Sequence, residues 1–127
     1  MRKTFVFHKL QVWHLAKGLV IDVYKITMIF PTEEKFGLVS QINRAAVSIA
    51  SNIAEGSGRT IRKDQAHFTQ VAYGSLMEVA CQMEISSDLG FVADIDLDAV
   101  YSKIDTLAEK LSALRASQLK MMKDENK

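Results

Sequence analysis

Residues 44–59 of the 127-residue chain read RAAVSIASNIAEGSGR. Apolar side chains recur in this stretch at spacings of three and four, which is typical of the buried face of an α-helix. Small residues between them allow a second helix to approach closely. Gly56 and Gly58 follow where the periodicity stops. The stretch therefore predicts a buried helix that ends in a glycine-rich turn.

The same periodicity continues on both sides of this stretch. It predicts four helices, at about residues 7–29, 33–55, 62–89 and 97–123. Pro31 separates the first two, because the residue before a proline disfavours helical backbone. The connections are short and no segment alternates at period two. We therefore expect an all-α fold, an antiparallel up-down-up-down four-helix bundle, formed as one domain by residues 1–127.

The helix faces and ends are also predictable from the spacing. The expected apolar faces of the first two helices are Leu10, Trp13, Ala16, Val20, Val23 and Tyr24, and then Leu38, Ile42, Ala45, Ile49 and Ile53. We expect Thr32 to cap the second helix and Asp96 the fourth. Gly56 and Gly58 are expected to end the second helix in left-handed conformations, and Gly90 to end the third.

The composition indicates a globular protein, with 48% apolar and 24% charged residues. No apolar run approaches the roughly 20 residues that span a bilayer, so we expect no membrane association. The basic N-terminus lacks the unbroken apolar region of a signal peptide. A single cysteine, Cys81, excludes an intramolecular disulfide. These features predict a cytoplasmic location.

The net charge of +1 hides an asymmetry along the chain. Residues 1–63 carry ten Lys/Arg and four Asp/Glu, a net charge of +6, whereas residues 64–127 carry six and eleven, a net charge of −5. Either the two halves attract each other, within the bundle or between subunits, or one end forms a basic patch for a polyanion.

Residues that could support catalysis or bind a metal are sparse. His8 and His14 lie six positions apart, on different sides of one predicted helix, and no HExxH motif is present. Cys81 has acidic neighbours, Glu78 and Glu84, instead of the positive surroundings of a reactive thiol, and we expect it to be a small core residue. The sequence therefore predicts a non-enzymatic protein without metal or cofactor.

The candidate nucleic-acid-binding residues surround the glycine-rich turn. They are Arg59, Arg62 and Lys63, with Arg44 one helix back. Free backbone N–H groups in such a turn, just before a helix, attract anions. The alternative is an ordinary helix end followed by solvated arginines.

A line of polar residues follows one side of the second helix and forms the expected structural network. Its members are Arg44, Ser48, Asn52 and Glu55, and the third helix offers Ser75 and Glu78 as partners. Buried polar groups must be paired, so this line favours packing specificity over catalysis. It faces either the third helix, with an Arg44–Glu78 ion pair, or a neighbouring subunit.

These motifs carry a family resemblance. Residues 7–16 read FHKLQVWHLA, residues 48–59 read SIASNIAEGSGR, and residues 72–78 read AYGSLME. Together with FP, FGL, QI and RAA between residues 30 and 46, the pattern resembles a bacterial four-helix-bundle family. Genes of this family often lie in intervening sequences of 23S ribosomal RNA. The resemblance extends to about residue 91, and the fourth segment matches only as a generic helix.

The resemblance implies a homopentamer with a central channel and no established enzymatic activity. It also implies kinship with accessory proteins of diversity-generating retroelements, in which a basic pentamer engages nucleic acid and a reverse transcriptase. This chain departs from the pattern at Asn43, Ala50 and Ala66-His67, where relatives often carry a basic residue, a proline and an acidic-aromatic pair. Its net charge of +1 is low for a nucleic-acid binder.

The functional hypothesis is a non-enzymatic, oligomeric module associated with nucleic acid, RNA more than DNA. The alternative is an oligomeric scaffold that docks a partner protein without contacting nucleic acid.

Overall fold

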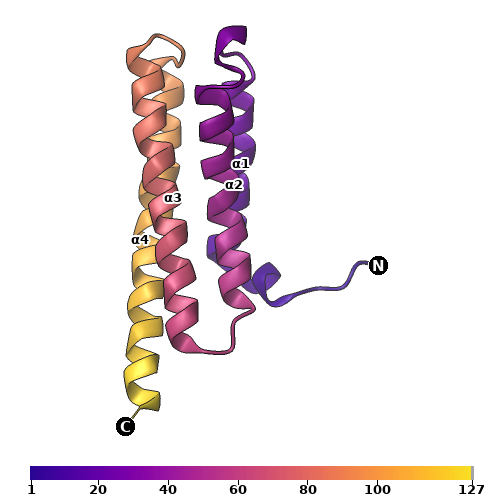
Figure 1. Cartoon of the computed structure of the whole chain (residues 1–127), viewed down its shortest axis with the longest axis vertical. Coiled ribbons are helices and arrows are strands. Elements are labelled where there is room, and N and C mark those ends of the chain that lie inside the picture. The colour runs from indigo at the N-terminus through magenta and orange to yellow at the C-terminus, as the bar shows by residue number, and fades with distance from the viewer. Residues whose placement is uncertain (127) are drawn as a thin grey trace.

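The computed structural model describes residues 1–126, and four long helices dominate it (Figure 1). They are α1 (Gln11–Thr27), α2 (Leu38–Ser57), α3 (Arg62–Asp88) and α4 (Asp94–Glu125). Two short 3₁₀ helices precede α1 and α2: η1 (Val6–Lys9) and η2 (Thr32–Glu34). The expected all-α class is confirmed.

The helices run up, down, up and down, as expected (Figure 1). Each packs on its neighbour in sequence, and α1 also packs on α4. Among residues 1–126 the diagonal pairs, α1 with α3 and α2 with α4, make no close backbone contact. This is the square arrangement of an antiparallel four-helix bundle. The N-terminus, the α2–α3 loop and the end of α4 lie toward one end, and the α1–α2 and α3–α4 connections lie at the other.

One continuous apolar core runs along the bundle axis. Its largest fully buried apolar side chains are Leu19, Val23, Ile42, Ile49, Leu76, Val79, Met83, Leu107 and Leu111. The apolar face expected for α2 is buried, except that Leu38 is only half-buried. On α1 the buried line is Val12, Ala16, Leu19, Val23 and Thr27. Tyr24 was expected on that face but is 44% exposed. The apolar face of α1 is therefore wider than the part of it that the other helices of the bundle cover.

The start of α2 differs from the expectation. Thr32 does not cap it, because residues 32–34 form the separate η2 turn and α2 begins only at Leu38. The Leu38 N–H donates to the Glu34 carboxylate instead (3.3 Å). Likewise α4 begins at Asp94, with Ala93 at the cap position, which places Asp96 inside the first turn.

The glycine-rich end of α2 also differs from the expectation. Gly58 has φ −87°, and among residues 1–126 only Gly90 has a positive φ (85°). Gly56 is buried inside the last turn of α2, where an added Cβ would lie 2.8 Å from the Cβ of Phe68. Gly56 therefore permits close packing of α2 on α3. Gly90 ends α3 as expected: its N–H donates to Ser87 O, and the Phe91 N–H donates to Ser86 O.

Candidate nucleic-acid interface

Folding converts the charge asymmetry of the sequence into an asymmetry between the two ends of the bundle. We call residues 1–18, 48–75 and 111–126 the basic half, since they occupy the end with the α2–α3 loop. The basic half carries ten Lys/Arg and four Asp/Glu, a net charge of +6. The other half, residues 19–47 and 76–110, carries five and eleven, a net charge of −6. We call it the acidic half.

Arg59 lies in the α2–α3 loop of the basic half. Its guanidinium donates to the Glu55 carboxylate one turn back (2.9 Å) and lies over the ring of Phe68, 4.7 Å from the centroid. The side chain remains 45% exposed. It is held in place by an ion pair that water screens and by a cation–π contact, so an anion can compete for it.

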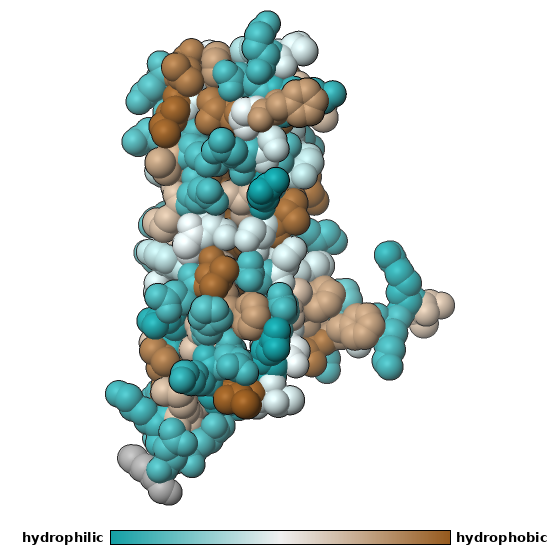
Figure 2. All heavy atoms as spheres, viewed as in Figure 1, coloured by the Kyte–Doolittle hydropathy of each residue, from teal (hydrophilic) through white to brown (hydrophobic). Residues whose placement is uncertain are grey.

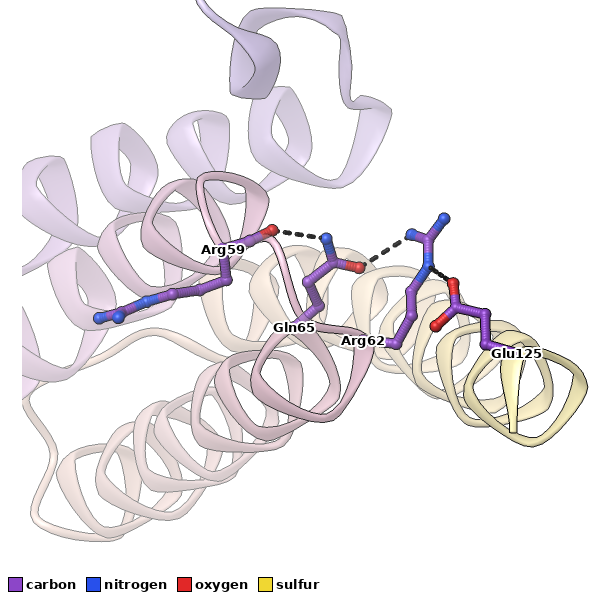
Figure 3. Close-up of polar contacts among 4 residues, drawn as sticks. All are labelled: Arg59, Arg62, Gln65 and Glu125. Atoms are coloured by element: carbon purple, nitrogen blue, oxygen red, sulfur yellow. Dashed lines mark hydrogen bonds and ion pairs between the residues drawn. The ribbon is translucent and has the colours of Figure 1, made fainter.

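Arg62 opens α3 and connects three elements (Figure 3). It donates from Nη1 to Gln65 Oε1 (2.9 Å) and from Nε to the Glu125 carboxylate near the end of α4 (3.2 Å). Gln65 in turn donates to the backbone carbonyl of Arg59 (2.7 Å). Figure 3 shows that the Arg59 side chain points away from the Arg62 guanidinium. The two arginines share one end of the bundle but do not form a single clamp.

A cavity of about 200 Å³ lies beside Arg62 at this end. Its lining includes Val6, Gly56, Gln65, Thr69 and Gln118. The hydroxyl of Thr69 donates to Gln118 Oε1 (2.8 Å), which pairs a buried polar group and ties α3 to α4. The cavity therefore combines a mostly apolar lining with a few polar groups at the basic half.

The glycine-rich turn lacks the free N–H groups that were expected of it. The N–H of Gly58 donates to Glu55 O and that of Arg59 to Gly56 O (both 3.1 Å). Lys63 is exposed in the first turn of α3. Arg44 lies 13 residues before the end of α2, about 20 Å along the helix, and is therefore separated from the α2–α3 loop. The structure brings together Arg59, Arg62 and Lys63, but not Arg44.

The polar line of α2 contacts α3, one of the two orientations left open by the sequence. Ser48 and Ser75 share a hydrogen bond across the two helices (2.8 Å). Asn52 donates to the backbone carbonyl of Ser48 (2.8 Å) and to its hydroxyl (2.9 Å). Half-buried groups are thereby paired, and the register of α2 against α3 is specified.

The expected Arg44–Glu78 ion pair is not formed. Both side chains are exposed, and within residues 1–126 neither forms an ion pair. Glu55, the last member of the line, pairs with Arg59 instead of a group on α3. The network is therefore shorter than expected and consists of Ser48, Asn52 and Ser75.

The histidines and the cysteine also differ from the expectation. His8 lies in η1 and His14 in α1, with the extended residue Leu10 between them, and His14 Nε2 donates to the backbone carbonyl of His8 (2.7 Å). Cys81 is exposed and is not a core residue. In the part of the chain that the structure describes, no three His, Cys, Asp or Glu side chains form a metal-binding group. No helix within residues 1–126 has both the length and the apolar character of a membrane span.

Sequence reasoning missed Gln65 and Glu125, which hold Arg62, and the aromatic side chains around His8. The predicted fold could have indicated Glu125 as a partner of Arg62, because an up-down-up-down bundle places the end of α4 beside the α2–α3 loop. The signal for the aromatic cluster was the interleaving of Phe5, Phe7 and Trp13 with basic residues near the N-terminus.

Comparison with known proteins identifies relatives of this fold. The profile of a family described as "23S rRNA-intervening sequence protein" matches residues 8–113, most of the chain. A crystal structure from Bacteroides thetaiotaomicron VPI-5482, of a protein with unknown function from the S23 ribosomal protein family, superposes with a TM-score of 0.74. The two chains are 17% identical, and the match covers 82% of this chain and 97% of the other. That structure is similar in fold. No curated protein gives a significant match.

Proposed function

We propose, since the chain belongs to the family of 23S rRNA-intervening sequence proteins, that it is an oligomeric module associated with nucleic acid, and with RNA in particular. The proposed contacts run from the basic half to phosphate groups, which position a nucleic acid without reading its sequence. Arg59, Arg62 and Lys63 are the proposed contact residues.

The observation that carries this proposal is the segregation of charge between the ends of the bundle. The net charge of the whole chain is only +1, which is low for a protein that binds a polyanion. The basic half nevertheless carries +6, and a local field attracts phosphate even where the total charge is near zero. The overall charge therefore underestimates the basic surface.

Self-association would strengthen such contacts, because copies whose helices lie side by side would present their basic halves together. The α1–α2 face is suited to such contact. A groove of about 320 Å³ follows it, lined by Trp13, Val20, Ile21, Val47 and Ala50 among others. Ile21 and Val47 are 47% and 40% exposed. Large exposed apolar side chains along one face indicate an interaction surface, and five copies is the number that the sequence resemblance implies.

The decisive experiment compares two double variants that remove the same charge from opposite ends. Binding of structured RNA and of duplex DNA is followed by fluorescence anisotropy across a salt series. The slope of log K against log salt is negative, and Arg59→Ala/Arg62→Ala should make it less steep by about two units, one for each arginine that no longer binds a phosphate. Lys25→Ala/Lys35→Ala, in the acidic half, should leave the slope unchanged.

A third variant tests the competition between carboxylate and phosphate. Glu125→Gln removes the charged partner of Arg62 without removing the arginine, and should strengthen binding. Equally weakened binding in the two double variants would refute the assignment to the basic half, because net charge alone would then explain both results. No binding at low salt would refute the nucleic-acid function. The scaffold alternative would remain, with the apolar α1–α2 face as the surface for a partner protein.

A further inference from the structure

The N-terminal arm, residues 1–9, extends away from the bundle near its basic half (Figures 1 and 2). Figure 2 shows strongly hydrophilic and moderately apolar side chains together on this projection. Arg2, Lys3 and Lys9 lie on the arm, Lys17 follows on α1, and the first acidic residue of the chain is Asp22. Within residues 1–126 none of these four basic side chains forms an ion pair. The arm therefore offers uncompensated positive charge.

Aromatic rings gather at the base of the arm. Phe5 lies nearly parallel to Phe7, with ring centroids 6.2 Å apart and an interplanar angle of 13°. Its ring is also close to parallel to that of His8, at 6.1 Å and 23°. Phe7 in turn contacts Trp13, with centroids 4.7 Å apart. Phe5 is 55% exposed, so the cluster presents an aromatic surface to solvent.

Local hydrogen bonds hold this cluster in place. The backbone N–H of Phe5 donates to His8 Nδ1 (2.9 Å). His14 Nε2 donates to the carbonyl of His8 (2.7 Å), which ties the η1 turn to α1. Rings fixed before a ligand arrives lose little conformational entropy when it binds. An exposed aromatic surface that is already ordered is suited to receive a further flat ring.

The flat rings that fit this surface are nucleobases. Proteins that bind single strands combine basic side chains along the backbone with aromatic rings on which bases stack. A duplex hides the faces of its bases, whereas a single strand exposes them. A second copy of the arm is less suitable, because it brings the same positive charges together. We propose that the N-terminal arm is a stacking site for single-stranded nucleic acid, in which a base lies on Phe5 and phosphates contact Arg2, Lys3 and Lys9.

This inference rests on the proposed nucleic-acid function and adds the class of ligand, a single strand, and a second contact surface. Its test uses a 12-nucleotide oligoadenylate as the single strand and a hairpin duplex RNA as the comparison. Trp13, the one tryptophan of the chain, reports on the cluster through its intrinsic fluorescence. Addition of the oligoadenylate to the wild-type protein should quench this fluorescence, and addition of the hairpin should not.

The variant Phe5→Leu removes the ring and retains an apolar side chain of similar size. It should weaken oligoadenylate binding about 5- to 150-fold, which corresponds to the loss of one base–aromatic stack. The salt slope should not change, because no charge is removed. Phe36→Leu is the matched control: Phe36 is 90% exposed beside Lys35 in the acidic half, and its replacement should have no effect.

The outcomes distinguish failure of the stacking site from failure of the proposed function. If Phe5→Leu binds oligoadenylate as the wild type does, the stacking site is wrong, even where the hairpin still binds through Arg59 and Arg62. If neither RNA binds, both proposals fail. If rising protein concentration alone shifts the Trp13 emission and Phe5→Leu abolishes that shift, the arm is buried between copies and the inference is overturned. Circular dichroism verifies that Phe5→Leu is folded.

Discussion

Replacement of Gly56 by alanine tests the close contact between α2 and α3 beside the α2–α3 loop. The new Cβ would lie 2.8 Å from Phe68 Cβ and 3.6 Å from the carbonyl oxygen of Gln65. Phe68 Cβ is fixed to the α3 backbone, so the helices themselves must shift. Overpacking of this kind costs about 1–3 kcal/mol, whereas alanine regains at most about 1 kcal/mol of helix propensity. We expect Gly56→Ala to lower the free energy of unfolding by about 1–2 kcal/mol.

Gly74→Ala is the matched control in the middle of α3. Apart from neighbouring residues of the same helix, nothing lies within 4 Å of the added Cβ, so helix propensity alone acts and should raise stability by about 0.5–1 kcal/mol. An unfolding entropy of about 2.1 cal/mol/K per residue makes 1 kcal/mol equivalent to about 4 °C for a chain of this length. The two variants should therefore differ in Tm by about 8 °C in thermal unfolding followed by circular dichroism.

The surroundings of the two glycines require stability changes of opposite sign: Gly56→Ala should destabilise the protein and Gly74→Ala should stabilise it. If Gly56→Ala is as stable as the wild type, the contact with Phe68 is looser than the structure places it. Gly18→Ala is a second control, because its Cβ also meets no atom within 4 Å. If all three alanine variants are stabilised alike, Gly56 is not closely packed against Phe68.

Two further predictions concern polar groups that join helices. The hydroxyl of Tyr101 lies within hydrogen-bond distance of Ala80 O (3.1 Å) and of the Glu84 carboxylate (3.3 Å). Burial and then the Glu84 charge raise the pKa of Tyr101 above its ordinary value of 10.0. The protonated hydroxyl therefore stabilises the fold below pH 10, and this contribution is lost as pH rises through the raised pKa. Tyr101→Phe should lack this part of the alkaline destabilisation, measured by urea unfolding from pH 8 to 11, and an identical pH profile would contradict the assignment. Ser48→Ala and Ser75→Ala should each cost about 1 kcal/mol, and the double variant clearly less than the sum, because either change already breaks the shared hydrogen bond. Strict additivity in a double-mutant cycle would show that the two hydroxyls do not interact.

The sequence predicted the fold class because apolar periodicity reflects burial directly. It predicted the end of α3 for a similarly local reason, since Gly90 takes the left-handed conformation that glycine favours. Gly56 shows the limit of this reasoning. A glycine near the end of a periodic segment can terminate a helix or admit a neighbouring helix, and the local sequence is the same in both cases. Only the position of Phe68 on α3 distinguishes them.

The candidate site was predicted in part. Arg59, Arg62 and Lys63 are close in sequence and therefore close in space, so their grouping followed from the chain itself. Arg44 was grouped with them wrongly. It lies on α2, 13 residues before that helix ends, which places it about 20 Å from the α2–α3 loop along the helix axis. The partner of Arg62 is Glu125, 63 residues away, and no local pattern indicates that pair.

The sequence by itself determined the four helices, most of the buried face of α2 and the presence of unequal charge along the chain, because each depends on neighbouring residues within a few turns. Only the tertiary structure decided where that charge accumulates. Antiparallel packing places the start of α1, the α2–α3 loop and the end of α4 at one end, which mixes residues from both halves of the sequence. The basic half of the bundle is therefore not the basic half of the chain: it gains Arg115, Lys120 and Lys123 from α4 and excludes Lys25, Lys35 and Arg44.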